Sequence, residues 1–343
     1  MTGDLTDLKA LIALVAGGKT LDRAQAELAF DIMMSGNATP SQMGGFLMAL
    51  RVRGETIEEI TGAASIMRAK AHRVRAPEGA MDVVGTGGDS AGTFNVSTAS
   101  AIVTAACGLP VAKHGNRAFS SRSGSADVLA ALGVNLDASY DVVERAIAEI
   151  GIGFMMAPRY HSAMRNVAPT RVELGTRTLF NLLGPLSNPA LVKRYLMGTF
   201  ALHWIEPMAR VLGNLGAERA WVVHGSDGLD ELTLTGPSHV CELKAGKISL
   251  FEVTPEEAGL ERARLEDLKG ADPAFNAQAM DGVLNGRKGP LRDFTLFNTA
   301  AALVVADHAQ DLRQGVRLAA AAIDSGRAQA LLGRLVAMTN GKE

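Results

Sequence analysis

The residues best suited to chemistry in this 343-residue chain begin in a glycine-rich loop. A short apolar run, Met81 to Val84, leads into Gly85-Thr86-Gly87-Gly88-Asp89, where closely spaced glycines let backbone N–H groups converge on one ligand. Shortly after, Ser97-Thr98 falls in the first turn of the apolar segment Val96–Cys107, which places hydroxyls at the positive end of a helix dipole. This combination predicts an anion site, and phosphate suits such a loop.

A second polar loop follows a second apolar run. Leu109–Ala112 is typical of a strand, and it is followed by the basic cluster Lys113-His114-Gly115-Asn116-Arg117. The cluster lies beside the first loop if the two strands are parallel neighbours. One glycine loop often marks only a turn, but the two loops together predict a cradle for a polyphosphate. The sequence has neither a Walker pattern nor a clean dinucleotide fingerprint, which disfavours ATP and NAD.

Five segments resemble, in order and spacing, the anthranilate phosphoribosyltransferase family. They are GTGGD from Gly85, NVST from Asn95, KHGNR from Lys113, the stretch from His161 to Pro189 that contains VAPTRVELGTRT, and His224-Gly225 to Asp230-Glu231. Together they span nearly the whole chain, so the match is far more specific than a lone glycine loop. The resemblance implies transfer of the 5-phosphoribosyl group of phosphoribosyl pyrophosphate to the amine of anthranilate, with release of pyrophosphate, in tryptophan biosynthesis.

The same resemblance assigns three sets of site residues. The phosphoribosyl pyrophosphate site comprises Gly85, Gly88, Asp89, Thr93, Asn95, Val96, Ser97, Thr98, Lys113, Asn116, Ser120, Ser121 and Ser125. The anthranilate site comprises Gly85, Asn116, Arg171, His114, His161 and Gly184. The metal ligands are Ser97, Asp230 and Glu231, and the implied cofactor is Mg²⁺, with two ions per subunit.

Side-chain chemistry is consistent with these roles. Arg171 has the planar fork that pairs bidentately with a carboxylate, and Asp230-Glu231 offers the hard oxygen ligands that suit magnesium. Considered alone, Ser97 could simply cap its helix, and Asp89 could cap its own loop. The reaction needs no covalent nucleophile, so we expect electrostatic and positional catalysis without an assigned catalytic residue.

Three residues that lie close to these motifs in the sequence are given other roles. Asp227 lies close to the acidic pair, but we rank it below that pair as a metal ligand. Arg117 and Arg177 are expected to serve the fold.

Alternating strands and helices would position these residues in a mostly parallel α/β sheet. The candidate strands are Met81–Val84, Leu109–Ala112, Gly153–Met156, Tyr195–Gly198 and Trp221–His224. The candidate helices are Val96–Cys107, Ala126–Leu132, Tyr140–Ile150 and Glu206–Leu215, with further helices from Asp272 onward. A hairpin around Ala245-Gly246 is predicted to join His239–Leu243 to Lys247–Val253.

The segment before the first strand is predicted to be helical. Thr20, Thr39-Pro40 and the pair Thr56 and Glu59 are typical of helix starts. By resemblance, we expect the nucleoside phosphorylase/phosphoribosyltransferase class: a small discontinuous helical domain over 1–73, joined in space by roughly 160–188, and an α/β domain over 80–343. A homodimer is implied as well, and the apolar faces of Leu5–Val15 and Leu21–Met34 could supply its surface.

Composition excludes several other classes of protein. With 34 Lys and Arg against 36 Asp and Glu, the chain lacks the basicity of a typical nucleic-acid binder. It has no basic region before a long apolar core and no apolar run that could span a bilayer, so we expect no signal peptide and no membrane partner. Cys107 and Cys241 form no disulfide framework and are predicted to be buried, which fits a reducing cytoplasm.

Three alternatives stay open at this stage. A pyrimidine nucleoside phosphorylase-like enzyme would share the fold, but KHGNR and Asp230-Glu231 follow the transferase pattern. A non-catalytic nucleic-acid-binding paralogue would be expected to lose parts of the site and to gain basic patches. A nicotinamide-dependent oxidoreductase would need a dinucleotide fingerprint. Two local departures from the family pattern, Ser162 and Leu202-His203-Trp204, affect only the expected loop geometry.

Overall fold

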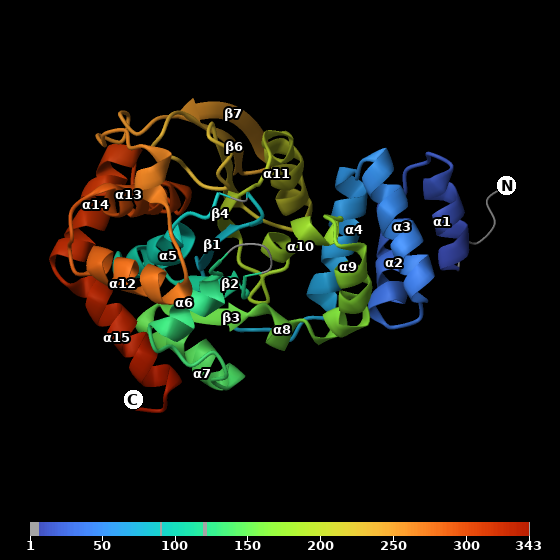
Figure 1. Ribbon diagram of the computed structural model, residues 1–343, viewed down its shortest axis with the longest axis horizontal. Coiled ribbons are helices and arrows are strands. Elements are labelled where there is room, and N and C mark those ends of the chain that lie inside the picture. Colours follow the sequence, from blue (N-terminus) through green and yellow to red (C-terminus); the bar gives the residue numbers. More distant parts are fainter. Residues whose placement is uncertain (1–6, 90, 119–121, 343) are drawn as a thin grey trace.

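The computed structural model describes residues 7–89, 91–118 and 122–342, and it contains a seven-stranded sheet beside a layer of helices (Figure 1). The strand order is β3-β2-β1-β4-β5-β6-β7. The strands are β1 (Met81–Gly85), β2 (Val111–Gly115), β3 (Ile152–Met156), β4 (Arg194–Gly198), β5 (Arg219–Gly225), β6 (Ser238–Lys244) and β7 (Lys247–Val253). Strands β1 to β5 pair in parallel, whereas β6 and β7 pair antiparallel at one edge. The prediction of a mostly parallel sheet is confirmed.

The strand order reverses beside β1. The chain runs from β1 out to β2 and β3, and then returns to β4 on the other side of β1. Such a reversal opens a crevice at the carboxyl ends of the strands, which is where α/β proteins bind ligands. Gly85 at the end of β1 pairs with Gly198 at the end of β4. The two loops and the Asp230-Glu231 stretch all follow strands that end at this edge.

Helices cover both faces of the sheet. They are α5 (Val96–Ala106), α6 (Ser125–Ala131), α7 (Tyr140–Arg145), α8 (Ala157–Tyr160), α11 (Ile205–Asn214), α12 (Pro273–Leu284), α13 (Pro290–Val305), α14 (Leu312–Asp324) and α15 (Arg327–Thr339). Side chains alternate across β1, as in any strand buried on both faces. Met81 and Val83 join the core that contains α5 and α13, whereas Val84 joins the core that contains α11 and the N-terminal helices.

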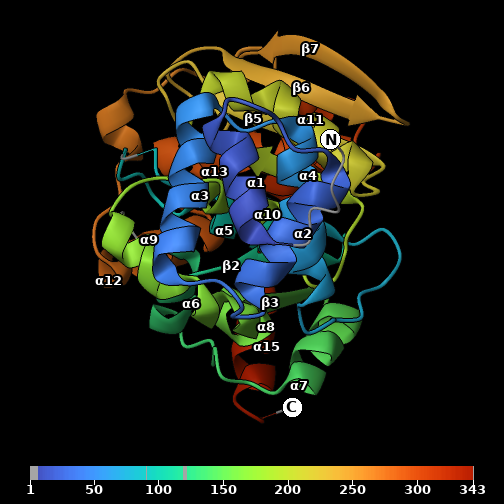
Figure 2. The same cartoon turned by 90° about the vertical axis from the view of Figure 1, so that its right-hand side faces the viewer.

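Four N-terminal helices form a separate layer, seen in front of the sheet in Figure 2. They are α1 (Leu8–Ala16), α2 (Arg23–Met34), α3 (Pro40–Arg53) and α4 (Ile57–Ala69). Thr39 and Thr56 cap α3 and α4 with reciprocal hydrogen bonds, as predicted. The expected start at Thr20 is wrong, because Asp22 caps α2. Asp22 has Gln25 three residues later and completes a capping box, which Thr20 cannot do with Arg23 in that position.

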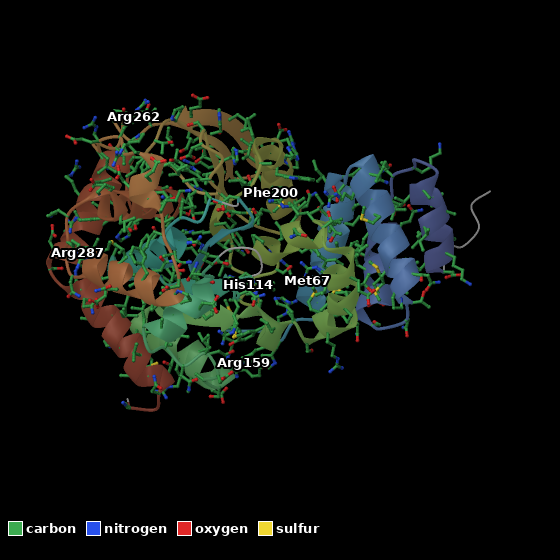
Figure 3. The ribbon with its side chains drawn as sticks, in the orientation of Figure 1. Met67, His114, Arg159, Phe200, Arg262 and Arg287 are labelled. Carbon is green, nitrogen blue, oxygen red and sulfur yellow. The ribbon has the colours of Figure 1, made fainter. Side chains whose placement is uncertain are left out.

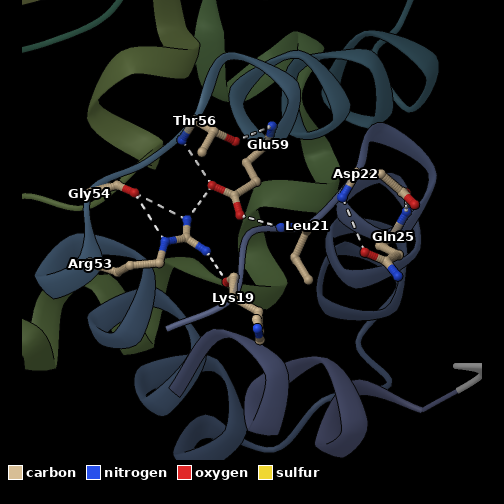
Figure 4. A network of polar contacts seen from close by, with 8 residues as sticks. All are labelled: Lys19, Leu21, Asp22, Gln25, Arg53, Gly54, Thr56 and Glu59. Carbon is tan, nitrogen blue, oxygen red and sulfur yellow. Dashed lines mark hydrogen bonds and ion pairs between the residues drawn. The ribbon is translucent and has the colours of Figure 1, made fainter. Parts of the chain in front are cut away.

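The buried carboxylate of Glu59 ties the turns between these helices together (Figure 4). Its oxygens accept hydrogen bonds from the Leu21 N–H at 2.8 Å and from the Thr56 N–H at 2.9 Å. Arg53 donates to the same carboxylate and to the carbonyl of Lys19. A buried carboxylate without these donors would be strongly destabilising, so this network fixes how α1 and α2 meet α3 and α4.

The chain between β3 and β4 returns to the N-terminal layer. In this segment η2 (Ser162–Asn166) packs against α2, α9 (Ala168–Leu174) against α3, and α10 (Phe180–Leu186) against α4. In Figure 1, α9 lies beside the blue helices. The segment therefore runs between the helical layer and the edge of the sheet that carries the loops.

Burial bears on two expected features, the apolar faces of the first two helices and the cysteines. On α1 and α2 the residues Leu11, Phe30 and Met33 are fully buried against helices of the same chain. Ile12, Leu14, Leu28 and Ile32 are only partly buried, so part of each apolar face stays accessible. Cys241 is buried as predicted, but Cys107 is only half-buried at the end of α5.

Several boundaries differ from the prediction, and one of them matters for the site. Strand β2 extends to Gly115, so Lys113 and His114 lie within an interior strand and not in a loop. The predicted helix Tyr140–Ile150 is α7 followed by the π-helical turn η1 (Ala146–Ile150). No helix within the described ranges is long and apolar enough to cross a membrane.

Candidate active site

Asp230 lies where the ends of three strands meet. It follows β5, and its carboxylate accepts a hydrogen bond of 2.7 Å from the N–H of Gly87. A Cβ atom at Gly85 would lie 2.4 Å from this carboxylate, and one at Gly198 would lie 1.5 Å from the Asp230 carbonyl oxygen. Only glycine fits at either position, because this stretch packs directly on both strand ends. The structure thereby brings the glycine loop and the acidic pair together.

The acidic pair is buried and short of positive charge. Asp230 and Glu231 are each 8% exposed. Burial raises the pKa of Asp230 to about 7, and the nearby charge of Asp89 adds to the rise. Burial and the negative charge of Asp230 raise the pKa of Glu231 well above its usual value. The positive charge of Lys113 and a hydrogen bond with the Ser97 hydroxyl oppose this rise. A bound cation would relieve this repulsion.

The oxygen atoms available here suit Mg²⁺, which substrate phosphates help to bind, better than a metal ion whose ligands all come from the protein. Among the described residues, no three His, Cys, Asp or Glu side chains form a metal-binding group. Asp230, Glu231 and the Ser97 hydroxyl supply only oxygen atoms. Magnesium commonly takes one or two carboxylates together with substrate phosphates and waters, so an incomplete oxygen site beside a phosphate loop suits this ion.

Lys113 lies beneath this cluster. It is 3% exposed, and its Nζ donates to the Val83 carbonyl at 2.6 Å. Burial lowers its pKa, whereas Asp82 and Glu231 act in the opposite direction. The Nζ group keeps donors beyond the Val83 bond, and its charge partly balances the buried carboxylates.

Asp82 is a buried acidic residue that the sequence reasoning missed. It lies on β1 and accepts hydrogen bonds from Asn188 Nδ2 at 2.7 Å and from the His114 N–H at 3.3 Å. Burial raises its pKa to about 6. The available signal was a carboxylate inside an otherwise apolar strand, since such residues are rarely buried without a partner.

The N-terminus of α5 is held by contacts with residues distant in the sequence. Asn95 accepts from the Ser123 hydroxyl at 3.1 Å and from Asn276 at 2.9 Å, so its side chain is already engaged within the protein. Thr93 forms a β-bridge with Lys269. The sequence reasoning missed both Lys269 and Asn276, because nothing local to them marks a contact with α5.

The remaining residues around α5 divide by burial. Val96 and Thr98 are each 1% exposed, so their side chains face the core. Ser97 is half-buried beside Glu231. The Asp89 carboxylate accepts from the Ala91 N–H at 3.1 Å, as a loop cap does.

The second loop is held by Asp127. Its carboxylate accepts from the N–H groups of Ala118 and Gly124 at 2.8 and 3.0 Å, and it pairs with Arg117 at 3.0 Å. The side chain of Asn116 accepts from the N–H of Arg117 at 2.8 Å. Ser125 donates to the Asn116 carbonyl at 3.3 Å, and the predicted residues Ser120 and Ser121 lie outside the described residues.

Asp227 is engaged away from the acidic pair. Its carboxylate accepts from the hydroxyls of Thr233 and Thr235 at 2.6 and 2.8 Å. These hydrogen bonds close the loop after β5, so the Asp227 carboxylate is already engaged within the protein.

Two buried histidines lie on the other side of β2. His114 Nδ1 is 3.1 Å from the carbonyl of Gly184, and its Nε2 is 3.2 Å from His161 Nε2. Burial lowers the pKa of His114 to about 3 and that of His161 to about 4. Both rings are therefore neutral near pH 7, and neither is a strong base. The structure brings these three predicted acceptor-side residues together. Figure 3 labels His114 between the sheet and the helical layer.

Arg171 is the cation predicted for the acceptor side. It lies on α9, half-buried, with its Cζ 5.3 Å from the centre of the Phe180 ring. Burial lowers its pKa. Among the described residues no carboxylate forms an ion pair with it. A partly desolvated guanidinium in this state is suited to bind a carboxylate ligand.

A separate cavity of about 590 Å³ lies away from these residues. It is bordered by the start of α11 and by β6 and β7, and its lining includes Leu202, His203, Leu250 and Phe251. It shares no residue with the two loops or the acidic pair, so we assign it no part in the chemistry above.

Comparison with known proteins agrees with this geometry. Residues 9–71 match the helical bundle domain of a glycosyl transferase family, and residues 77–329 match the α/β domain of the same family. The chain is 66% identical to the anthranilate phosphoribosyltransferase of Rhodospirillum rubrum over 97% of this chain and 96% of that protein.

Solved structures give the same result. The anthranilate phosphoribosyltransferase of Thermus thermophilus has a TM-score of 0.91 at 46% identity, with 96% of this chain and 99% of that chain covered. The Saccharomyces cerevisiae enzyme in complex with PRPP and Mg has a TM-score of 0.90 at 28% identity, with 97% and 98% covered. The chain therefore belongs to the glycosyl transferase family that includes the anthranilate phosphoribosyltransferases.

Proposed function

We propose that this chain transfers the 5-phosphoribosyl group of phosphoribosyl pyrophosphate to the amine of anthranilate and releases pyrophosphate, as a step of tryptophan biosynthesis. The observation that carries the proposal is the placement of two unlike groups of residues on neighbouring strands, with the glycine loop after β1 and His114 on β2. One half-site has backbone N–H groups and buried carboxylates around Asp230. The other has the neutral rings of His114 and His161, together with Arg171, which forms no ion pair with a carboxylate in the part of the chain that the structure describes. A polyphosphate with a metal ion suits the first, and an aromatic acid suits the second.

The first half-site would bind the leaving group. Backbone N–H groups of the glycine loop and the Lys113 ammonium would balance negative charge on pyrophosphate as the bond from the anomeric carbon to oxygen breaks. Ser97, Asp230 and Glu231 would hold Mg²⁺, which when bound neutralises further charge on the leaving pyrophosphate. We propose two ions per subunit on the resemblance to the anthranilate phosphoribosyltransferases, and the buried acidic pair beside a single lysine supports the binding of cations.

The second half-site would orient the acceptor. Arg171 would pair with the anthranilate carboxylate, and His114, His161 and Gly184 would border the ring. The amine lone pair would then form the new bond to the anomeric carbon. With both histidine pKa values lowered by burial, the amine proton would leave to water or to the departing pyrophosphate.

The test follows the fluorescence of anthranilate and the release of pyrophosphate together in purified protein. Loss of fluorescence that needs magnesium, phosphoribosyl pyrophosphate and protein would support the proposal, and pyrophosphate should appear in equal amount. Persistent anthranilate in the complete mixture would contradict it, and binding of phosphoribosyl pyrophosphate would then point to another acceptor.

We also propose a homodimer in the cytoplasm and a domain division into 1–73 with roughly 160–188, and 80–343. The dimer surface would use apolar residues of α1 and α2 that stay partly accessible, such as Ile12, Leu14 and Ile32. Sedimentation of the purified protein tests the dimer, and a monomer at micromolar concentration would contradict it.

A further inference from the structure

The chain between α9 and α10 contacts the glycine loop through one arginine. Arg177 Nη2 donates a hydrogen bond to the carbonyl of Gly88. Its Cζ also lies 4.3 Å from the centre of the Phe200 ring, which is within range of a cation–π contact. The N–H of Phe200 donates to the Thr86 hydroxyl at 3.0 Å. The guanidinium thus contacts the loop directly at Gly88 and indirectly at Thr86.

Arg177 is itself held from the helical layer. Arg51, in the last turn of α3, donates to the Thr176 hydroxyl and to the Arg177 carbonyl. A continuous set of contacts therefore runs from α3, through residues 176–177, to the glycine loop. Figure 3 labels Phe200 on the side of the sheet that faces the helical layer.

The glycine loop needs an external contact to fix its peptide groups. Gly87 and Gly88 have φ angles of +65° and +78°, a region open to glycine at little cost. Such a loop has several accessible peptide orientations of similar energy. In a trans peptide the carbonyl and the following N–H point in opposite directions. A donor that holds the Gly88 carbonyl on one side therefore aims the Asp89 N–H to the other.

We propose that Arg177 is a positioning residue that orients the Gly88–Asp89 peptide for the pyrophosphate, and that Arg51 supports it from the helical layer. This inference rests on the proposed function of the site. It also links the two half-sites, because Arg171 and Arg177 belong to the same segment. Arg177 acts through the loop and does not contact the reacting atoms.

The main test is Arg177→Met, which keeps an unbranched apolar stem and removes the guanidinium with its donors. We expect the KM for phosphoribosyl pyrophosphate to rise roughly 10- to 100-fold, the range for a lost charge-assisted hydrogen bond. The KM for anthranilate and the melting temperature should stay near the wild-type values. Arg177→Lys should recover part of the loss, because its ammonium keeps the charge and can still donate to a carbonyl. Arg165→Met, at an exposed arginine of η2, is the matched control and should leave both KM values unchanged.

Two further variants test the proposal without a change at position 177, in case Arg177→Met folds poorly. Phe200→Leu removes only the ring and should raise the same KM about two- to fivefold. Arg51→Met should raise it less than Arg177→Met does, and it should add nothing in the Arg177→Met background, because the two act in series. An unchanged KM for phosphoribosyl pyrophosphate, an equal rise in both KM values, or additive effects of the two arginines would overturn the proposal.

Binding alone separates this inference from the proposed function. Calorimetric titration with phosphoribosyl pyrophosphate and magnesium needs no turnover with anthranilate. If the wild type binds without consuming anthranilate, the proposed reaction fails, yet weaker binding by Arg177→Met would still support the positioning role. Equal affinity of the two proteins would contradict that role whatever the acceptor.

Discussion

The two half-sites differ in how tightly their residues are packed. On the phosphate side Asp230 packs directly on two strand ends, with its backbone against Gly198 and its carboxylate against Gly85, at distances that leave no room for a Cβ atom. The acceptor side is made of side chains on β2, α9 and α10, and a Cβ atom added at Gly184 would have no atom within 4 Å. The first side should therefore tolerate almost no substitution, whereas the second should change specificity before it loses stability.

The largest expected effect is removal of the acidic pair on the phosphate side. Asp230→Ala combined with Glu231→Ala should lower kcat/KM about 100- to 1000-fold, because charge on the leaving group would lose its stabilisation. The magnesium dependence of the rate should shift to higher concentration. A magnesium titration of the initial rate measures this, with Asp227→Asn as a control in the same loop. An unchanged magnesium profile would remove the pair from the metal site.

The next largest effect is expected from alanine at Gly198, in contrast with alanine at Gly184. Gly198→Ala should lower the rate by about 100-fold or more, because the added methyl must displace Asp230 by at least an ångström. It should also lower the free energy of unfolding by roughly 1–3 kcal/mol. Gly184→Ala should leave stability the same or slightly higher, since alanine favours the helix, while it raises the KM for anthranilate. Urea unfolding and initial rates measure both variants. Similar losses of stability in the two would contradict the difference in packing between the phosphate side and the acceptor side.

Arg171→Ala should act on the acceptor side alone. We expect the KM for anthranilate to rise roughly 10- to 100-fold with the loss of a charged, bidentate contact. The KM for phosphoribosyl pyrophosphate should change little. Initial rates over a grid of both substrates give the two values. An equal loss for both substrates would refute the assignment of Arg171 to the carboxylate.

The smallest expected effect is the acid sensitivity of the acceptor side. The pKa values of His114 and His161 fall from 6.5 to about 3 and about 4, so the unfolded chain takes up protons first as the pH drops. The contribution of these two histidines to stability should therefore be complete above pH 6.5 and should decline toward pH 4, opposite in sign to that of the buried carboxylates, whose pKa values are raised. His161→Gln should recover roughly 1–2 kcal/mol of the decline between pH 7 and pH 5. Urea unfolding at the two pH values measures it, and an equal decline in the variant would mean that other groups cause it.

Local patterns in the sequence determined the elements and the phosphate side. The run Met81–Val84, the glycines after it and the alternation of strands and helices each depend on neighbours within a few residues, and all are present in the structure. The capping box of Thr56 and Glu59 was predicted for the same reason. The order and spacing of the motifs then allowed the site residues to be assigned.

Tertiary structure alone decided which contacts join distant segments. Pairing with β1 and β3 on both edges drew Lys113 and His114 into a buried strand, and packing within the helical layer set which apolar residues of α1 and α2 are buried. The contacts of Asp82 with Asn188 and of Arg177 with Gly88 leave no local trace, because their partners lie far away in the chain. Short-range chemistry fixes helices, strands and turns, but the chain path sets which side chains meet.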